Sequence, residues 1–177
     1  MFLTEFFGFF SLSAFSSWGF LMAFFFNVFV YTIDVKRNTT LLLSSFIMMA
    51  SYATSDYFFT WLSIGTSVYL DWTIYDYVTI LFLISVFFIQ KKTTPSFIYL
   101  ITGLIINSIL SIAMHYDIYI EGNRVSWILW DVYTFGVNII DLIMIVVLIV
   151  DRDFLGLHKL KNKFFKGSSI QPENNFS

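Results

Sequence analysis

The chain has 177 residues, of which 58% are hydrophobic and only 12% are charged, and its mean hydropathy is +0.76. A soluble domain carries about twice that share of charged residues, so the composition argues against a soluble globular protein. The sequence contains no cysteine, which excludes disulfides, thiolate catalysis and cysteine-ligated metal sites. The net charge of −2 excludes no class of partner.

Five stretches are long and apolar enough to form membrane-spanning helices, which need roughly 20 residues each. They cover residues 6–31, 40–62, 72–89, 96–116 and 127–150. Asn38 or Thr39 is expected to cap the second helix and Asp71 the third, and Pro95 stands near the start of the fourth. None of the stretches alternates polar and apolar residues as barrel strands do. We therefore predict an all-α integral membrane protein, built as a bundle of about five transmembrane helices.

The basic residues predict the orientation of this bundle. With five spans, nine of the ten basic residues lie on one side of the membrane, and Arg124 alone lies on the other. Basic residues favour the cytoplasmic side of short loops, so we expect the N-terminus outside and the C-terminus in the cytoplasm. The membrane would be the cell membrane, which is the inner membrane in a bacterium. Trp61, Trp72, Trp127 and Trp130 fall near the predicted outer boundary, where tryptophan rings form an interfacial belt.

The C-terminal segment is predicted to lie outside the bundle. Apolar residues recur at helical spacing within residues 151–166, and the other positions are rich in lysine. A basic amphipathic helix of this kind is typical of segments that lie on the anionic inner leaflet. The lysines concerned are Lys159, Lys161, Lys163 and Lys166. Residues 167–177 are polar and are expected to form a disordered tail.

One face of the fifth span carries polar residues. Asp131, Thr134, Asn138 and Asp141 are three, four and three residues apart, which places them on one face of a helix. Polar groups inside a membrane point at protein or at water, and they are functional candidates for that reason. Asp141 would lie about 20 Å from the outer end of the span. We predict that these four residues form a polar seam or line an ion pathway.

A second face, on the first span, carries small residues. Ser16, Gly19, Ala23 and Asn27 are spaced three, four and four apart, and small residues in such a row let two helix backbones approach closely. The fourth span has a comparable row at intervals of four, formed by Gly103, Asn107, Ser111 and His115. We expect both rows to mark contacts between helices.

The outer half of the bundle is predicted to be acidic. Asp56, Asp76 and His115 fall near the outer ends of the second, third and fourth spans, and we call these three residues the outer acidic vestibule. They suit three interpretations: helix caps at the interface, a site for a cation or cationic ligand, or a metal or acid-base site at His115. One histidine without a second ligand at the usual spacing is a weak metal signature. We therefore predict no metal and no cofactor.

The sequence contains no motif for nucleotide binding, for serine hydrolases or for zinc peptidases, and it does not support nucleic-acid binding. The leading hypothesis is a non-enzymatic membrane protein that acts by associating with itself or with a protein partner. A bacterial accessory, immunity or defence component would suit so small a chain. The alternatives are a small channel or cation pathway lined by intramembrane Asp and Asn, and an intramembrane enzyme that uses a buried carboxylate as general acid.

Overall fold

The structure is a computed structural model that describes residues 12–33, 38–58, 67–91 and 94–151, apart from the side chains of residues 12, 13 and 56–58. Every regular element in these ranges is helical. The elements are α2 (Leu12–Thr32), α3 (Thr39–Phe58), α4 (Val68–Gln90), α5 (Pro95–His115), a π-helical turn η1 (Tyr116–Ile120) and α6 (Ile128–Val150). The predicted all-α class is confirmed.

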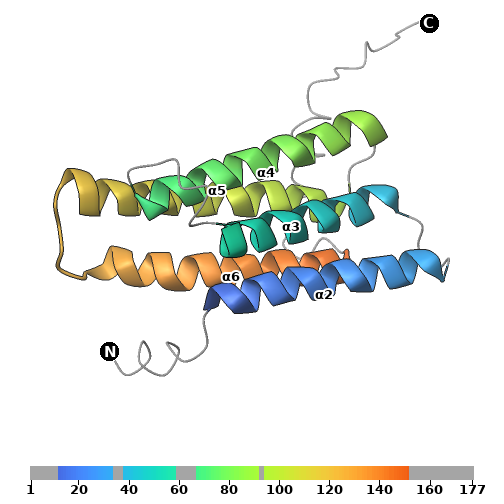
Figure 1. The fold of residues 1–177 in the computed structure, drawn as a ribbon, viewed down its shortest axis with the longest axis horizontal. Coiled ribbons are helices and arrows are strands. Elements are labelled where there is room, and N and C mark those ends of the chain that lie inside the picture. Colours follow the sequence, from blue (N-terminus) through green and yellow to red (C-terminus); the bar gives the residue numbers. More distant parts are fainter. Residues whose placement is uncertain (1–11, 34–37, 59–66, 92–93, 152–177) are drawn as a thin grey trace, which may run out of the picture.

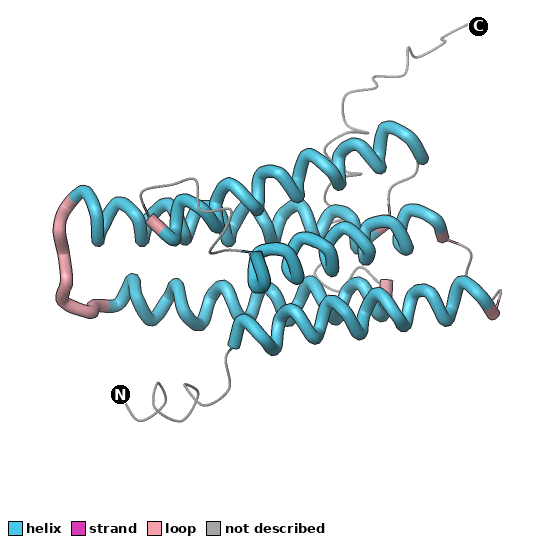
Figure 2. The backbone as a smooth tube through the Cα atoms, in the orientation of Figure 1, coloured by secondary structure: helices cyan, strands magenta, loops and turns pink. Residues whose placement is uncertain are grey.

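The five long helices run antiparallel to their chain neighbours along one axis (Figure 1). In space α2 packs on α3 and α6, α3 also packs on α4, and α5 packs on both α4 and α6. Each helix therefore packs mainly on two neighbours, and the five close into a ring, across which α3 and α5 also touch. One end of the bundle holds the ends of α4 and α6, and the other holds η1 and the start of α6 (Figures 1 and 2). Lys91 directly follows α4. We call the two ends the Lys91 end and the η1 end.

Helices α4 and α5 start at residues whose side chains accept a hydrogen bond from a backbone N–H group of the first turn. Helix α5 begins at Pro95, and the Thr94 hydroxyl accepts a hydrogen bond from the Phe97 amide at 3.2 Å. Helix α4 was predicted to start at Asp71, but it begins earlier, because Ser67 caps it by accepting from the Leu70 amide at 3.3 Å. A hydroxyl at the cap position is as effective as a carboxylate.

By length and composition, four helices in the described ranges are apolar enough to cross a membrane. They are Ala14–Thr32, Val68–Gln90, Pro95–Ile120 and Ile128–Val150. Five spans were predicted. Residues 59–62 of the second lie outside the described residues, and the described part of that span, α3, is not among the four. It is more polar because it contributes Ser44, Ser45 and Ser51 to the inside of the ring, where the first two are fully buried. The chain is thus a multi-pass membrane protein with a fifth, more polar helix in its bundle.

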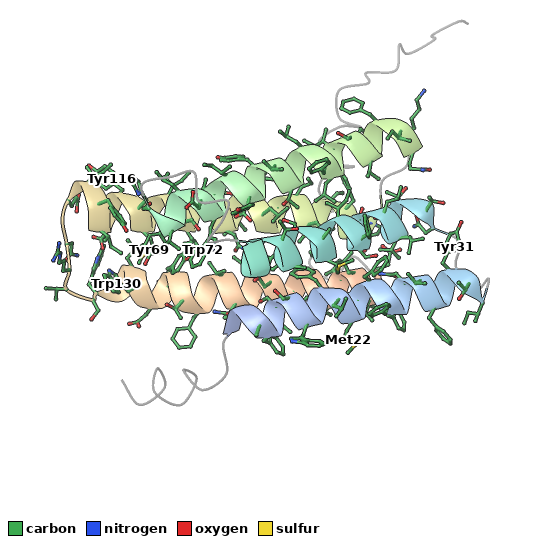
Figure 3. All side chains as sticks on the ribbon, in the orientation of Figure 1. Met22, Tyr31, Tyr69, Trp72, Tyr116 and Trp130 are labelled. Carbon is green, nitrogen blue, oxygen red and sulfur yellow. The ribbon has the colours of Figure 1, made fainter. Side chains whose placement is uncertain are left out.

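Large apolar side chains cover the outside of the bundle. On α2, Phe15, Trp18, Met22 and Phe29 are each more than half exposed, and Leu81 and Ile89 on α4 are 64% and 74% exposed. Figure 3 shows Met22 pointing away from the helices. Water would penalise such a surface by about 25 cal/mol for each Å² of apolar area, whereas lipid does not.

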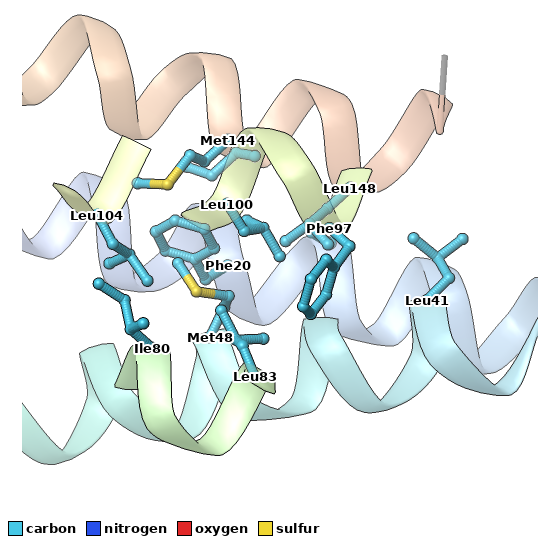
Figure 4. Close-up of a cluster of buried hydrophobic side chains, with 12 residues drawn as sticks. Phe20, Leu41, Met48, Ile80, Leu83, Phe97, Leu100, Leu104, Met144 and Leu148 are labelled. Atoms are coloured by element: carbon cyan, nitrogen blue, oxygen red, sulfur yellow. The ribbon is translucent and has the colours of Figure 1, made fainter. Parts of the chain in front are cut away.

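An apolar core fills the centre of the ring toward the Lys91 end (Figure 4). It draws on all five helices, since it comprises Phe20, Ala23, Leu41, Met48, Ile80, Leu83, Phe97, Leu100, Leu104, Met144, Ile145 and Leu148. These residues come from the halves of α3, α4, α5 and α6 that lie nearer to Lys91. The centre of the bundle is therefore closed in that half.

The small-residue row on α2 packs against α6 within the same chain. Gly19 lies against the Ile145 side chain, and the Asn27 amide donates to the Leu148 carbonyl at 3.1 Å. Ser16, Ala23 and Asn27 are all buried. The row is thus used for packing inside the chain.

Several predicted features lie outside the described residues. They are the first residues of the first span (6–11), the side chain of Asp56, most of the basic helix at 151–166 with its four lysines, and the tail at 167–177.

Candidate functional site

The half of the ring toward the η1 end encloses a partly open cavity of about 290 Å³. All five long helices line it, with Ser16 from α2, Ser51, Tyr52 and Ser55 from α3, Trp72, Tyr75 and Asp76 from α4, Asn107 and Ser111 from α5, and Tyr133, Thr134, Val137, Asn138 and Asp141 from α6. Val137 is the one aliphatic residue in this lining. A polar cavity thus lies next to the apolar core along the axis of the bundle.

Asp141 lies at the wall of the cavity on α6 and is 4% exposed. Its Oδ1 accepts a hydrogen bond from the Tyr52 hydroxyl at 2.6 Å and another from the Asn107 side-chain amide at 2.9 Å. The Ser16 hydroxyl also interacts with this carboxyl group. Donors from α2, α3 and α5 therefore converge on one residue of α6, and each of them is neutral.

Asp76 lies on α4 and lines the same cavity. Its one hydrogen bond in the described structure is from the Ser108 hydroxyl of α5 to Oδ2, at 3.3 Å. No lysine, arginine or histidine is among the residues that line the cavity. The cavity therefore has two carboxyl groups and no basic side chain to balance them.

Aromatic rings form another part of the wall. Tyr52, Trp72, Tyr75 and Tyr133 all line the cavity. The Trp72 and Tyr133 rings are nearly parallel, at 13° with centroids 6.4 Å apart, and Tyr69 meets both of them edge-on at 5.9 and 5.6 Å. Figure 3 places Tyr69 and Trp72 close together on α4. Carboxyl groups and aromatic side chains thus line the same space.

One buried polar atom at the wall has no partner. Asn107 is 3% exposed, and its Oδ1 accepts no hydrogen bond within the described structure. Its Nδ2 donates to Asp141, which orients the amide and leaves the carbonyl oxygen unused. A buried acceptor without a donor costs about 1–3 kcal/mol, so this oxygen lowers the stability of the wall around Asp141.

Three of the four residues on the polar face predicted for α6 line the cavity. Thr134, Asn138 and Asp141 line it, and the Asn138 amide donates to the Thr134 carbonyl of its own helix at 2.6 Å. Asp131 is exposed and does not line the cavity. The first turn of α6 lies beyond the cavity toward the η1 end, which is why a residue on the expected helix face falls outside it.

The outer acidic vestibule is not assembled as a unit. Asp76 lines the cavity, but His115 does not. The His115 Nδ1 is instead 2.7 Å from the Ser67 hydroxyl, and its ring stacks on Tyr119 with centroids 5.3 Å apart. The side chain of Asp56 lies outside the described residues. Within the described residues, no group of three His, Cys, Asp or Glu side chains could hold a metal ion.

Asp117 has a separate, structural environment at the η1 end. It is 3% exposed and accepts hydrogen bonds from the indole N–H groups of Trp127 and Trp130 at 3.0 Å and from the Asn123 amide at 3.1 Å. These contacts tie η1 to the start of α6. The two tryptophans, which the sequence suggested as part of an interfacial belt, thus also hold the connection between two helices.

Sequence reasoning missed Tyr52, Tyr75 and Tyr133 as parts of the site. A tyrosine in an apolar helix can face lipid near the interface or the interior of the bundle, and the pattern of these helices does not separate the two. One signal was present: Trp72 and Asp76 are four residues apart and therefore share a helix face.

No known protein family, curated protein or solved structure is similar to this chain. The chemistry of the cavity must therefore be argued from its own residues.

Proposed function

We propose that this multi-pass membrane protein binds a small, positively charged ligand in the cavity between its helices. One observation carries the proposal, namely that Asp76 and Asp141 line the same cavity without a basic residue among its lining. Binding without chemical conversion needs no further group, so the proposal is for a non-enzymatic protein.

The physical argument concerns charge in a medium of low polarity. An ionised carboxylate that is removed from water without a counter-charge is costly, and two of them in one cavity also repel each other. A cation placed between them relieves both costs, and the attraction is stronger than in water because the surrounding helices and lipid screen it little. The hydroxyl and amide groups around the cavity can replace part of the hydration shell that the cation gives up.

The test is ligand-induced stabilisation of the full-length protein in lipid nanodiscs. The panel contains sodium, potassium, phenethylammonium and benzyltrimethylammonium, each as the chloride. At a concentration about 100 times its Kd, a bound ligand adds about 2.7 kcal/mol to the free energy of unfolding. At least one cation is expected to raise the Tm in a saturable way.

Asp76→Asn and Asp141→Asn are expected to abolish or strongly weaken this stabilisation. Asp131→Asn is the matched control, because it removes one carboxylate from α6 outside the cavity, and it should retain the full effect. A panel in which no cation stabilises the protein, or an equal loss in Asp131→Asn, would refute the proposal.

A cation pathway is the second candidate, since the same carboxylates would attract a permeant ion. The apolar core toward the Lys91 end speaks against it, because twelve buried apolar residues fill the centre of the ring there. We expect liposomes that contain the protein to show no steady sodium or potassium flux. Flux that Asp141→Asn changes while the protein stays folded would favour the pathway over simple binding.

Association with a partner or a second copy stays a prediction. The small-residue row on α2 and the polar residues of α6 motivated it. The row on α2 packs against α6 within one chain, and of the α6 residues Asp141 is buried whereas Asp131 and Thr134 are exposed. Crosslinking in native membranes would test it independently of ligand binding.

A further inference from the structure

The two carboxyl groups of the cavity differ in how far the protein already satisfies them. Asp141 receives the hydroxyl of Tyr52 and the amide of Asn107 at normal hydrogen-bond distances. Asp76 receives one hydroxyl, at 3.3 Å. A carboxylate can accept about four hydrogen bonds, so Asp76 retains most of its capacity to bind a donor from a ligand.

The surroundings of Asp76 are aromatic. Trp72 lies one helical turn before it on α4, and Tyr75 is its chain neighbour. Both rings line the cavity, and Tyr133 adds a ring from α6 that stacks on Trp72. A cation over such faces is attracted by their quadrupoles, most strongly where water is excluded, and quaternary ammonium groups are recognised in this way.

The size and the polar contacts of the cavity restrict the ligand further. A volume of about 290 Å³ is at the lower end of the range for small-molecule sites. The polar residues Ser51, Ser55 and Ser111 also line the cavity. The cavity thus suits a compact cation with an apolar body.

We infer that the ligand is a small organic ammonium ion, with Asp76 as its counter-ion and the rings of Trp72 and Tyr133 around its apolar part. This inference rests on the proposed function and narrows it to one chemical class. Asp141 acts as a positioning residue, because its hydrogen bonds hold Tyr52 and Asn107 at the cavity wall.

An inorganic cation fits this site less well. A metal ion must exchange its bound water for several oxygen ligands at once. The described residues contain no cluster of three metal-binding side chains, and besides hydroxyl and amide groups the cavity is lined by Trp72 and three tyrosines. An ammonium group instead needs one carboxylate and apolar or aromatic surface around its carbon atoms.

The experiment uses benzyltrimethylammonium as the probe, with isothermal titration calorimetry on the full-length protein in nanodiscs. Its uncharged carbon analogue, neopentylbenzene, has the same shape and is the matched ligand control. Saturable binding is expected for the ammonium ion and not for the analogue. A tenfold excess of sodium over the probe should not displace it.

The variants separate charge from aromatic surface. Asp76→Asn should weaken binding of the probe at least about tenfold, which corresponds to about 1.4 kcal/mol. Tyr133→Leu, which removes a ring, should weaken it about three- to tenfold, whereas Tyr133→Phe keeps the ring and should retain most of the affinity. Asp131→Asn should bind as the unaltered protein does. Circular dichroism and gel filtration show which variants are folded. Tyr133→Phe is the control for Tyr133→Leu, and Asp131→Asn is the control for Asp76→Asn.

The outcomes that overturn the inference differ from those that overturn the proposed function. If sodium or potassium stabilises the protein in a saturable way and the ammonium probe does not bind, the cavity is a cation site and the inference of an organic ligand is wrong. Equal binding by Tyr133→Leu and Tyr133→Phe would remove the aromatic contribution. If no cation binds, the proposed function itself fails.

Discussion

Two aspartates in this bundle are satisfied by neutral donors from other parts of the chain. Asp141 takes them from Tyr52 and Asn107, and Asp117 takes them from Trp127, Trp130 and Asn123. Neutral donors meet the hydrogen-bonding needs of a carboxyl group without supplying a balancing charge. At Asp117 the result is a connection between two helices. At Asp141, beside Asp76 in a cavity, the same arrangement leaves two carboxyl groups without a basic residue in the lining, and the proposed cation site rests on this.

The Tyr52 hydroxyl provides a test at the scale of a single hydrogen bond. Tyr52→Phe removes the donor to Asp141 and keeps the ring that lies 4.2 Å from Phe20. Hydrogen bonds between membrane helices contribute about 0.6–2 kcal/mol, so we expect a loss of about 1 kcal/mol in unfolding free energy, measured by denaturation in mixed micelles. Tyr77→Phe, at a half-exposed tyrosine of α4, should change stability by less. An equal effect of both changes would contradict the structural role of the hydrogen bond.

At the scale of the helix, close packing depends on glycine at one position on α5. A Cβ on Gly103 would lie 2.5 Å from the Met144 sulfur and 3.2 Å from Ile140 Cγ2, so α5 and α6 approach each other there without space for a side chain.

Helix α3 shows a different use of small residues, because its buried serines face the interior of the ring. These serines help to make α3 the most polar of the five helices.

Gly103→Ala and Gly136→Ala form a matched pair on the two facing helices. An added methyl group at Gly103 meets the Met144 chain near its middle, and overpacking of this kind costs about 1–3 kcal/mol. At Gly136 it meets the end of the flexible Leu110 side chain at 3.2 Å, and the gain in helix propensity of up to about 1 kcal/mol offsets the contact. Thermal unfolding should show a lower Tm for Gly103→Ala and little change for Gly136→Ala. The reverse order would contradict the described contact between α5 and α6.

For the molecule as a whole, the ring of helices is divided along its axis. Apolar side chains fill the centre toward the Lys91 end, and a polar cavity occupies the centre toward the η1 end. The apolar half supplies packing that holds the helices in place. The arrangement of the helices therefore does not depend on the two carboxyl groups of the cavity, which have no basic partner in its lining. This division suits binding from one end better than passage through the membrane.

The predicted orientation can be tested directly, because the chain has no cysteine of its own. Thr39→Cys and Glu121→Cys place single thiols at opposite ends of the bundle, at exposed positions. In intact cells a membrane-impermeant thiol reagent should label the cysteine at 121, and the one at 39 should react only after permeabilisation. Labelling in the opposite order would reverse the orientation, and labelling of both from one side would contradict a spanning bundle.

The helical class and most of the helix ends follow from local chemistry, which a sequence displays. Helices can be predicted from runs of apolar residues, from Pro95 at a helix start and from the break after Ile89, without knowing which helices pack together. In lipid, each span must satisfy its own backbone hydrogen bonds. The misplaced start of α4 has a local cause as well, since Ser67 and Asp71 are both acceptable caps. The residues of the candidate site could be predicted in part, because Asp141, Asn138 and Asp76 are polar groups in apolar helices.

The sequence by itself determined that the protein is helical and crosses a membrane, and that polar groups lie within its spans. Only the tertiary structure decided which of them meet. Asp76 and Asp141 line one cavity with Trp72 and Tyr133, whereas Asp131 and His115 lie outside it. The reason is physical: the rotation of each helix about its axis is set by packing such as Gly103 against Met144 and Gly19 against Ile145. These contacts join residues more than 40 positions apart, and no local pattern reports them.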